Sequence, residues 1–401
     1  MSTVANESTL SVDLKNYPWP VFDADEVEAA ASVLRSGKVN YWTGKVGREF
    51  EREFAEYFGV KHAIALANGT VTLQACLKAL EIGCGDDVIT TPRTFIGTSS
   101  AIVMEYARPV MADINRETGN ITAETIERAL TPNTKAIMPV HLGGWPCEMD
   151  DIMALAEEKG LKVIEDCAQS HGALYKGKHA GVYGHAASWS YCQDKIMTTG
   201  GEGGMVSTED EELWSRMWSV KDHGKGWNTV YNQPHPPGFR WLHDGWGTNW
   251  RMTEMQSAIG REQLKKLPEW TDLRNRNAHI IEDRLRPLSA LRVPIVPDHI
   301  RHAYYKLYVY VRPEALKDDW TRDRILAEIA TQGVPGLSGS CSEIYLEKAF
   351  TSKNMGPAER LPVAQELGET SMMFMVHPTL PASVMHDVAE IVGQTVLRAT
   401  R

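Results

Sequence analysis

The sequence predicts an α/β protein: a large domain whose mainly parallel sheet is sandwiched by helices, and a smaller C-terminal α+β domain. Two observations predict this fold class. Short apolar runs alternate with helical patterns between residues 87 and 192, as in strand–helix–strand units. At 401 residues, the chain is also long enough for a large domain and a smaller partner. We expect an N-terminal arm at 1–20, the large domain at 21–268 and the small domain at 269–401.

The first two helices are predicted from their starting residues. Asp23 and Glu26 have the three-residue spacing of a capping box, and the apolar residues at 27, 30, 31 and 34 then repeat at helical spacing up to Gly37. A second helical repeat begins directly after Asn68-Gly69-Thr70. Both helices are therefore expected to be amphipathic.

Five short apolar runs predict strands, and the segments between them predict helices. The strands are expected at 87–91 (DVITT), 108–114 (RPVMADI), 135–140 (KAIMPV), 161–166 (LKVIED) and 186–192 (AASWSYC). Helical patterns lie at 122–130 (TAETIERAL) and 150–160 (DDIMALAEEKG). This alternation favours a mainly parallel sheet.

The character of the chain changes at 222–250, which is dense in Gly, Pro, His and Trp. We expect a long ordered loop there, and loops of that length are usually functional. A helix over 253–267 is expected to end at Pro268, since proline breaks helix interiors. A strand at 304–311 and helices at 322–333 and 382–397 are expected in the small domain.

Composition disfavours several function classes. The net charge of −10, without a lysine-arginine run, argues against a nucleic-acid partner. No signal peptide and no run of about 18 apolar residues is present, so we expect no membrane association. The six cysteines form no CxxC pair, and the histidines form no HExxH motif. These patterns predict a cytoplasmic protein with reduced thiols and no metal site.

Lys195 stands between an apolar strand and a glycine-rich loop, in the segment SYCQDKIMTTGGEGGM at 190–205. The glycines do not match the GxGxxG fingerprint of dinucleotide sites. A single lysine is more often a solvated surface residue than a catalyst. Lys195 therefore becomes a candidate only in combination with other features of the chain.

Two other features accompany it. Asp166 ends the predicted strand 161–166, at the edge where open α/β sheets bind ligands, although an N-cap or an ion-paired aspartate is the plainer interpretation. Asn68-Gly69-Thr70 offers a helix start suited to a phosphate, or a plain helix cap. One ligand would use all three features: pyridoxal 5'-phosphate, with its phosphate at a helix start, its pyridinium nitrogen on an aspartate and its aldehyde on a lysine.

The chain resembles the DegT/DnrJ/EryC1/StrS family of sugar aminotransferases, which are fold-type I pyridoxal phosphate-dependent enzymes, from about Tyr17 to the last helix. Six segments carry the resemblance in the order of the family: 67–73 (ANGTVTL), 91–101 (TPRTFIGTSSA), 140–150 (VHLGGWPCEMD), 163–173 (VIEDCAQSHGA), 190–204 (SYCQDKIMTTGGEGG) and 248–260 (TNWRMTEMQSAIG). The chain departs from many relatives at 333–350 (GVPGLSGSCSEIYLEKAF), where they carry a His-Tyr pair before a proline-rich turn.

The resemblance implies a homodimer with shared active sites, in which Lys195 bonds covalently to the cofactor and Asp166 binds its pyridine nitrogen. It also implies further cofactor contacts: Phe95 on the ring face, Gln169 near the phenolic oxygen, and a phosphate site made by the backbone of Gly69 and Thr70, the hydroxyl of Ser190 and, across the dimer boundary, Asn249. Each has a plainer interpretation: core packing for Phe95, an inward-facing strand residue for Ser190, and turn residues for Gln169 and Asn249.

The predicted function is transfer of an amino group from L-glutamate to C3 or C4 of a nucleotide-linked deoxysugar, for lipopolysaccharide, other polysaccharide or natural-product amino-sugar biosynthesis. Three alternatives remain open. The acceptor is a keto-cyclitol or an unlinked sugar phosphate; the protein is a dehydratase of the family, against which Lys195 argues because those enzymes carry histidine there; or it is a non-catalytic cofactor-binding regulator.

Overall fold

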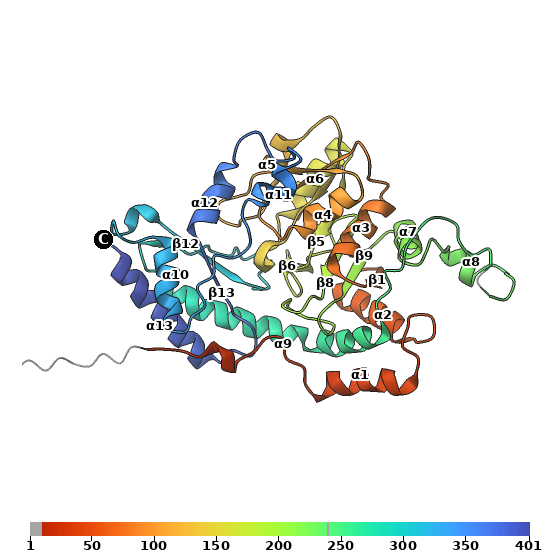
Figure 1. Cartoon of the computed structure of the whole chain (residues 1–401), viewed down its shortest axis with the longest axis horizontal. Helices are drawn as coiled ribbons and strands as arrows, with labels where there is room; N and C mark the ends of the chain where they lie inside the picture. Colours follow the sequence, from red (N-terminus) through yellow and green to blue (C-terminus); the bar gives the residue numbers. More distant parts are fainter. Residues whose placement is uncertain (1–9, 239) are drawn as a thin grey trace, which may run out of the picture.

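The structure is a computed structural model and describes residues 10–238 and 240–401. Within these residues, seven strands form the central sheet in the order β1-β9-β8-β5-β4-β2-β3 (Figure 1). All neighbouring pairs in this sheet are parallel except the two that involve β9. The strands are β1 (His62–Leu66), β2 (Asp87–Thr90), β3 (Arg108–Met111), β4 (Thr134–Met138), β5 (Lys162–Asp166), β8 (Ala186–Ser190) and β9 (Gly204–Thr208). The predicted α/β class with a mainly parallel sheet is confirmed.

Helices cover both faces of this sheet because its strands are apolar on both sides. In β4, Ala136 and Met138 belong to the core shared with α3 and α7, whereas Ile137 belongs to the core shared with α5 and α6. Successive strand residues point to opposite faces, so both sides of the sheet are buried. The helices of this part are α1 (Ala24–Ser36), α2 (Val46–Phe58), α3 (Gly69–Ala79), α4 (Gly97–Met104), α5 (Ala123–Ala129), α6 (Met149–Lys159) and α7 (Glu211–Lys221).

The capping box predicted for α1 is present: Asp23 and Glu26 bond reciprocally to each other's backbone N–H groups. Its apolar face is less buried than the pattern suggests, since Val27 and Leu34 are 61% and 58% exposed. The ammonium of Lys266 binds Asp23, Asp25 and Glu26, and Glu26 is buried. This ion-paired edge, rather than the Val27 stripe, therefore faces α9.

The expectation that a helix ends at Pro268 is wrong. Helix α9 runs continuously over Glu254–Leu285 and contains Pro268. A proline in a helix interior costs roughly 3 kcal/mol. Leu264, Leu267 and Trp270 are buried on either side of it, and burial of such side chains contributes about 1.5–3 kcal/mol each. The burial of these side chains therefore outweighs the hydrogen bond lost at Pro268. Helix α9 runs across residue 268, where the large domain was expected to end, and the division into domains stays a prediction.

The segment 222–250 contains a short helix, α8 (Trp227–Tyr231), that the loop prediction omitted. Its aromatic side chains explain the helix: Trp227 packs edge-on against Trp214 and Trp218 at 4.9 and 5.0 Å between ring centroids. Residue 239 lies outside the described residues. The rest of the described segment is largely irregular, as predicted.

The C-terminal part holds a second, antiparallel sheet in the order β10-β12-β13, packed against α9, α10 and α13 (Figure 1). A third small sheet has the order β11-β6-β7.

Residues 1–9 of the predicted N-terminal arm lie outside the described residues. None of the helices in 10–238 and 240–401 is long and apolar enough to cross a membrane. The remaining elements are β6 (Leu174–Tyr175), β7 (Lys178–His179), β10 (Leu291–Arg292), β11 (Ile300–Arg301), β12 (Leu307–Val311), β13 (Ser371–Phe374), α10 (Arg322–Ala330), α11 (Lys348–Thr351), α12 (Pro362–Thr370) and α13 (Ala382–Ala399).

Candidate active site

A cavity of about 740 Å³ lies at the carboxyl ends of the parallel strands. It collects side chains from β5, β8, the start of α3 and the start of α4. Seven of the eight residues singled out in the sequence line this cavity: Gly69, Thr70, Phe95, Asp166, Gln169, Ser190 and Lys195. The convergence of segments more than 100 residues apart makes this cavity the candidate active site.

Asp166 ends β5 and points its carboxylate into the cavity, where the side chain is almost fully buried. Its Oδ1 accepts the backbone N–H of Ala168 at 3.1 Å, and its Oδ2 accepts the hydroxyl of Thr98 at 2.9 Å. Burial raises the pKa of Asp166, against the opposing effect of these two donors and of the Lys195 charge. A cation placed beside the Asp166 carboxylate would compensate its buried negative charge.

Lys195 lies in the turn after β8 and is partly exposed to the cavity. Its ammonium stands 5.0 Å from the centroid of the Tyr305 ring. Among the described residues, no carboxylate lies within 4.0 Å of this ammonium, in contrast to most buried lysines. The amine thus faces the cavity without a fixed counter-ion.

The start of α3 closes one end of the cavity. Gly69 must be glycine, because a Cβ there would lie 2.5 Å from the Cβ of Ser190. Asn68 caps the helix: its Oδ1 accepts the N–H groups of Thr70 and Val71 at 3.0 and 3.1 Å. The Thr70 N–H is thus used by the helix cap, while Gly69, Thr70 and Ser190 line the cavity, and their phosphate contacts stay a prediction.

Phe95 and Gln169 differ in how firmly they are held. Phe95 is 70% exposed at the cavity, so it is not a core residue in this chain. Gln169 is buried, and its Oε1 accepts the backbone N–H of Gly143 at 2.7 Å. That bond fixes the amide so that its nitrogen is left as a donor. Gln169 does lie in a turn, as the plainer interpretation expected, and its side chain is buried and hydrogen-bonded there.

Asn249 is the one predicted residue that the chain does not bring to its own cavity. It is exposed and pairs with Asp222 in an isolated bridge at the base of the 222–250 segment. Its expected contact with the cofactor of a second subunit stays a prediction.

Several cavity residues were missed by sequence reasoning. Thr98 lies three residues after Phe95, in the first turn of α4, a spacing that places both at the same helix end. Tyr305 and Ser340 come from the C-terminal part, and no local pattern marks them. Tyr305 donates its hydroxyl to Asp194, the residue before Lys195, and burial and this carboxylate raise the pKa of Tyr305.

Beneath Asp166, a buried group of His141, Glu165 and Cys167 has the composition of a metal site. The side-chain nitrogens of His141 and the carboxylate of Glu165 already have partners. Glu165 accepts the backbone N–H groups of Gly181, Tyr183 and Gly184, as well as His141 Nε2 at 3.0 Å. The arrangement is that of a structural network that supports the end of β5.

Comparison with known proteins identifies the fold and its chemistry. The model of the DegT/DnrJ/EryC1/StrS aminotransferase family matches residues 20–393. The chain belongs to this family. It is therefore an aminotransferase, as the resemblance implied.

Three relatives illustrate the similarity. An aminotransferase from Psychrobacter cryohalolentis with a solved structure is 54% identical, with a TM-score of 0.94 over 95% of this chain and 99% of that chain. GDP-perosamine synthase from Caulobacter vibrioides is 39% identical over 78% of this chain and 84% of its own length. UDP-N-acetyl-3-dehydro-alpha-D-glucosamine 3-aminotransferase from Acidithiobacillus ferrooxidans is 33% identical over 88% and 89%. This family member is thus similar over 78% and 88% of its length to two proteins named for nucleotide sugars, one of which is named as an aminotransferase.

Proposed function

We propose that this family member uses pyridoxal 5'-phosphate to transfer an amino group from L-glutamate to C3 or C4 of a nucleotide-linked keto-deoxysugar, in amino-sugar biosynthesis for polysaccharide or natural products. The observation that carries the proposal is the convergence of Lys195, Asp166 and the start of α3 on one cavity. The names of the Caulobacter and Acidithiobacillus relatives support a nucleotide-sugar acceptor.

The residues of the cavity fit this cofactor. Among the described residues, Asp166 has no cation within 4.0 Å, so a buried carboxylate awaits a positive partner such as a pyridinium. The hydroxyls of Thr70 and Ser190 and the N–H of Gly69 suit a phosphate. Phe95 presents an exposed aromatic face, and the Gln169 amide presents a donor.

When bound, pyridoxal phosphate supplies an electron-accepting ring that stabilises the negative charge left when a substrate loses a proton from carbon. Asp166 would keep the ring nitrogen protonated, and the hydrogen bonds from Thr98 and Ala168 favour the ionised carboxylate against the burial that raises its pKa. Lys195 would hold the cofactor through its side-chain nitrogen, and its amine would serve as the base that moves a proton between substrate and cofactor carbons.

The proposed unit is a homodimer with shared active sites. Support comes from exposed apolar side chains beside the cavity, at the end of α4 and just after it: Phe95, Met104 and Tyr106 are 70%, 64% and 82% exposed. Apolar groups gathered in this way are typical of a surface that a partner covers. Asn249 would then reach the cofactor of the second subunit. We also propose a cytoplasmic location, supported by six free cysteines.

The acceptor is tested with the cofactor-loaded enzyme and L-glutamate. Nucleotide-linked 4-keto- and 3-keto-6-deoxyhexoses, a keto-cyclitol and an unlinked keto-sugar phosphate are offered in separate reactions, and the products are identified by mass. We expect a nucleotide-linked aminosugar, with far less product from the other acceptors. Preferred amination of the cyclitol or the sugar phosphate would replace the proposed substrate class. A dehydrated sugar without nitrogen would support the alternative that the protein is a dehydratase. The absence of any product would support the alternative that it is a non-catalytic cofactor-binding regulator.

A further inference from the structure

The N-terminal arm contacts the backbone of Lys195 itself. The indole Nε1 of Trp19 donates a hydrogen bond to the carbonyl oxygen of Lys195 at 2.9 Å, although the two residues are 176 positions apart. The proposed reaction assigns no role to Trp19. A long-range hydrogen bond to the main chain of the cofactor-binding lysine therefore needs an explanation.

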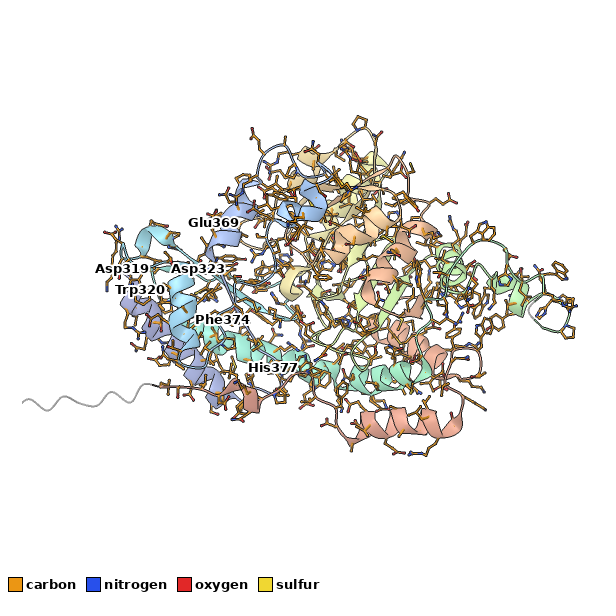
Figure 2. The ribbon with its side chains drawn as sticks, viewed as in Figure 1. Asp319, Trp320, Asp323, Glu369, Phe374 and His377 are labelled. Carbon is orange, nitrogen blue, oxygen red and sulfur yellow. The ribbon has the colours of Figure 1, made fainter. Side chains whose placement is uncertain are left out.

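The indole of Trp19 is held from several directions. Trp270 of α9 packs edge-on against it at 5.1 Å, and the ring of His377 stacks at 6.0 Å. The guanidinium of Arg274 lies 4.9 Å from the Trp19 ring centroid. Figure 2 labels His377 beside α9, and Asn277 of this helix donates its side-chain N–H to the His377 carbonyl at 3.1 Å. These contacts leave the Trp19 N–H little freedom to point elsewhere.

The arm is also fixed to the C-terminal part of the chain. The hydroxyl of Thr379 donates to the carbonyl of Pro18 at 3.0 Å, and the backbone N–H of Val12 donates to the carbonyl of Gln332 at 3.0 Å. Trp19 thus links the C-terminal part to the turn after β8. The arm is therefore bonded both to the C-terminal part and to the main chain of Lys195.

The turn itself has few anchors near the lysine. The N–H of Lys195 donates to the carbonyl of Cys192 at 3.1 Å, within the same turn, and Tyr305 binds the side chain of Asp194. Among the described residues, Trp19 is the hydrogen-bond donor to the Lys195 carbonyl. Without it, the Lys195 carbonyl would lose this hydrogen bond.

We propose that Trp19 is a positioning residue: it fixes the main chain of Lys195 so that the amine is aligned with the cofactor's aldehyde carbon. This rests on the proposed cofactor-binding role of Lys195. A hydrogen bond between neutral groups changes an equilibrium by about three- to tenfold. Trp19 therefore changes how tightly the lysine-bound cofactor is retained and the pH at which it is protonated, but the bond between Lys195 and the cofactor still forms without it.

The test compares Trp19→Phe with Trp270→Phe in the full-length, cofactor-loaded protein. Both variants shorten a tryptophan of the same cluster, but only the first removes the hydrogen bond to Lys195. The measurements are the rate of cofactor release into a scavenger, the pH midpoint of the lysine-bound cofactor's visible absorbance, and the thermal unfolding temperature. We expect Trp19→Phe to release the cofactor about three- to tenfold faster and to shift the midpoint, whereas Trp270→Phe, which keeps an aromatic ring against Trp19 and leaves its N–H in place, mainly lowers the unfolding temperature.

Equal release rates and midpoints in the two variants would overturn the inference. If Trp19→Phe fails to fold, Thr379→Val replaces it: this variant frees the arm from the Thr379–Pro18 hydrogen bond, although it also removes the bond between Thr379 and His377 Nδ1. It should shift release and midpoint in the same direction, and no shift would contradict the proposal. Lys195→Ala separates the two claims. If that variant keeps the visible band, the proposed role of Lys195 fails; if it loses the band while Trp19→Phe matches Trp270→Phe, only the role of Trp19 fails.

Discussion

Thr98, in the first turn of α4, donates its hydroxyl hydrogen to Oδ2 of Asp166 at 2.9 Å, and both side chains are buried. A buried carboxylate is costly unless donors surround it. Thr98 and the Ala168 N–H thus offset part of the burial that raises the pKa of Asp166. The two donors thus favour the ionised carboxylate that a pyridinium would bind.

Replacement of Thr98 by valine tests this relationship. A hydrogen bond to a charged group contributes about 1.5–3 kcal/mol, so Thr98→Val should lower kcat by roughly ten- to a hundredfold and raise the pH at which activity appears. Thr98→Ser is the matched control and should keep most activity.

Asp166→Asn should cost several kcal/mol in proton transfer and reduce cofactor content less than activity. Wild-type turnover in Asp166→Asn would mean that another group supports the ring.

Lys195→Ala should fold and show none of the visible absorbance of covalently bound cofactor, because alanine has no amine to bond to the aldehyde. Lys306 offers a matched control. Its ammonium lies 4.8 Å from the same Tyr305 ring, and burial lowers the pKa of Lys306. Lys306→Ala should keep the absorbance. If instead Lys306→Ala lost the band and Lys195→Ala kept it, the two lysines would exchange roles.

Asn249→Ala should weaken cofactor binding in the dimer if Asn249 serves the opposite subunit. Loss of one phosphate contact of 1.5–3 kcal/mol corresponds to roughly a tenfold or larger rise in the dissociation constant. The measurement is cofactor affinity as a function of protein concentration, since retention and dimer formation should be linked. Asn232→Ala, at an exposed position of the same loop, is the control. A monomer that binds the cofactor as tightly as the dimer would rule out a shared site.

Much of the sheet and most of the site could be predicted because their signals are local. Asp166 ends an apolar run, and Asn68 stands before a helical repeat, so a single short window reveals each. The continuity of α9 through Pro268 could not be predicted, since it depends on burial of Leu267 and Trp270 by distant elements. Tyr305 and Trp19 reach the site from the C-terminal part and the arm, and no spacing within the sequence reports such contacts.

Because of the buried His171, we expect the free energy of unfolding to decrease in acid. It is fully buried without a hydrogen-bond partner among the described residues, and burial lowers its pKa to about 3. An unfolded histidine titrates near 6.5, so as the pH falls below ~6.5 the unfolded state binds a proton that the native state does not. The stability present above ~6.5 is then lost by about 1.4 kcal/mol per pH unit, down to the folded pKa. Urea unfolding of His171→Phe between pH 6.5 and 4.5 should show a slope smaller by about this amount; an unchanged slope would exclude His171 as its source.

One half-reaction tests, without any sugar, whether Lys195 and Asp166 carry out an amino transfer from L-glutamate. Stoichiometrically loaded enzyme is mixed with L-glutamate, and the visible spectrum and 2-oxoglutarate are followed together. We predict loss of the lysine-bound cofactor band, appearance of the pyridoxamine form, and one 2-oxoglutarate released per active site, since Lys195 moves the amino acid's α-proton and water supplies the keto oxygen of 2-oxoglutarate. A nucleotide-linked keto-deoxyhexose should then restore the band and leave as an aminosugar. An unchanged band with glutamate, glutamine, aspartate and alanine alike would contradict the account.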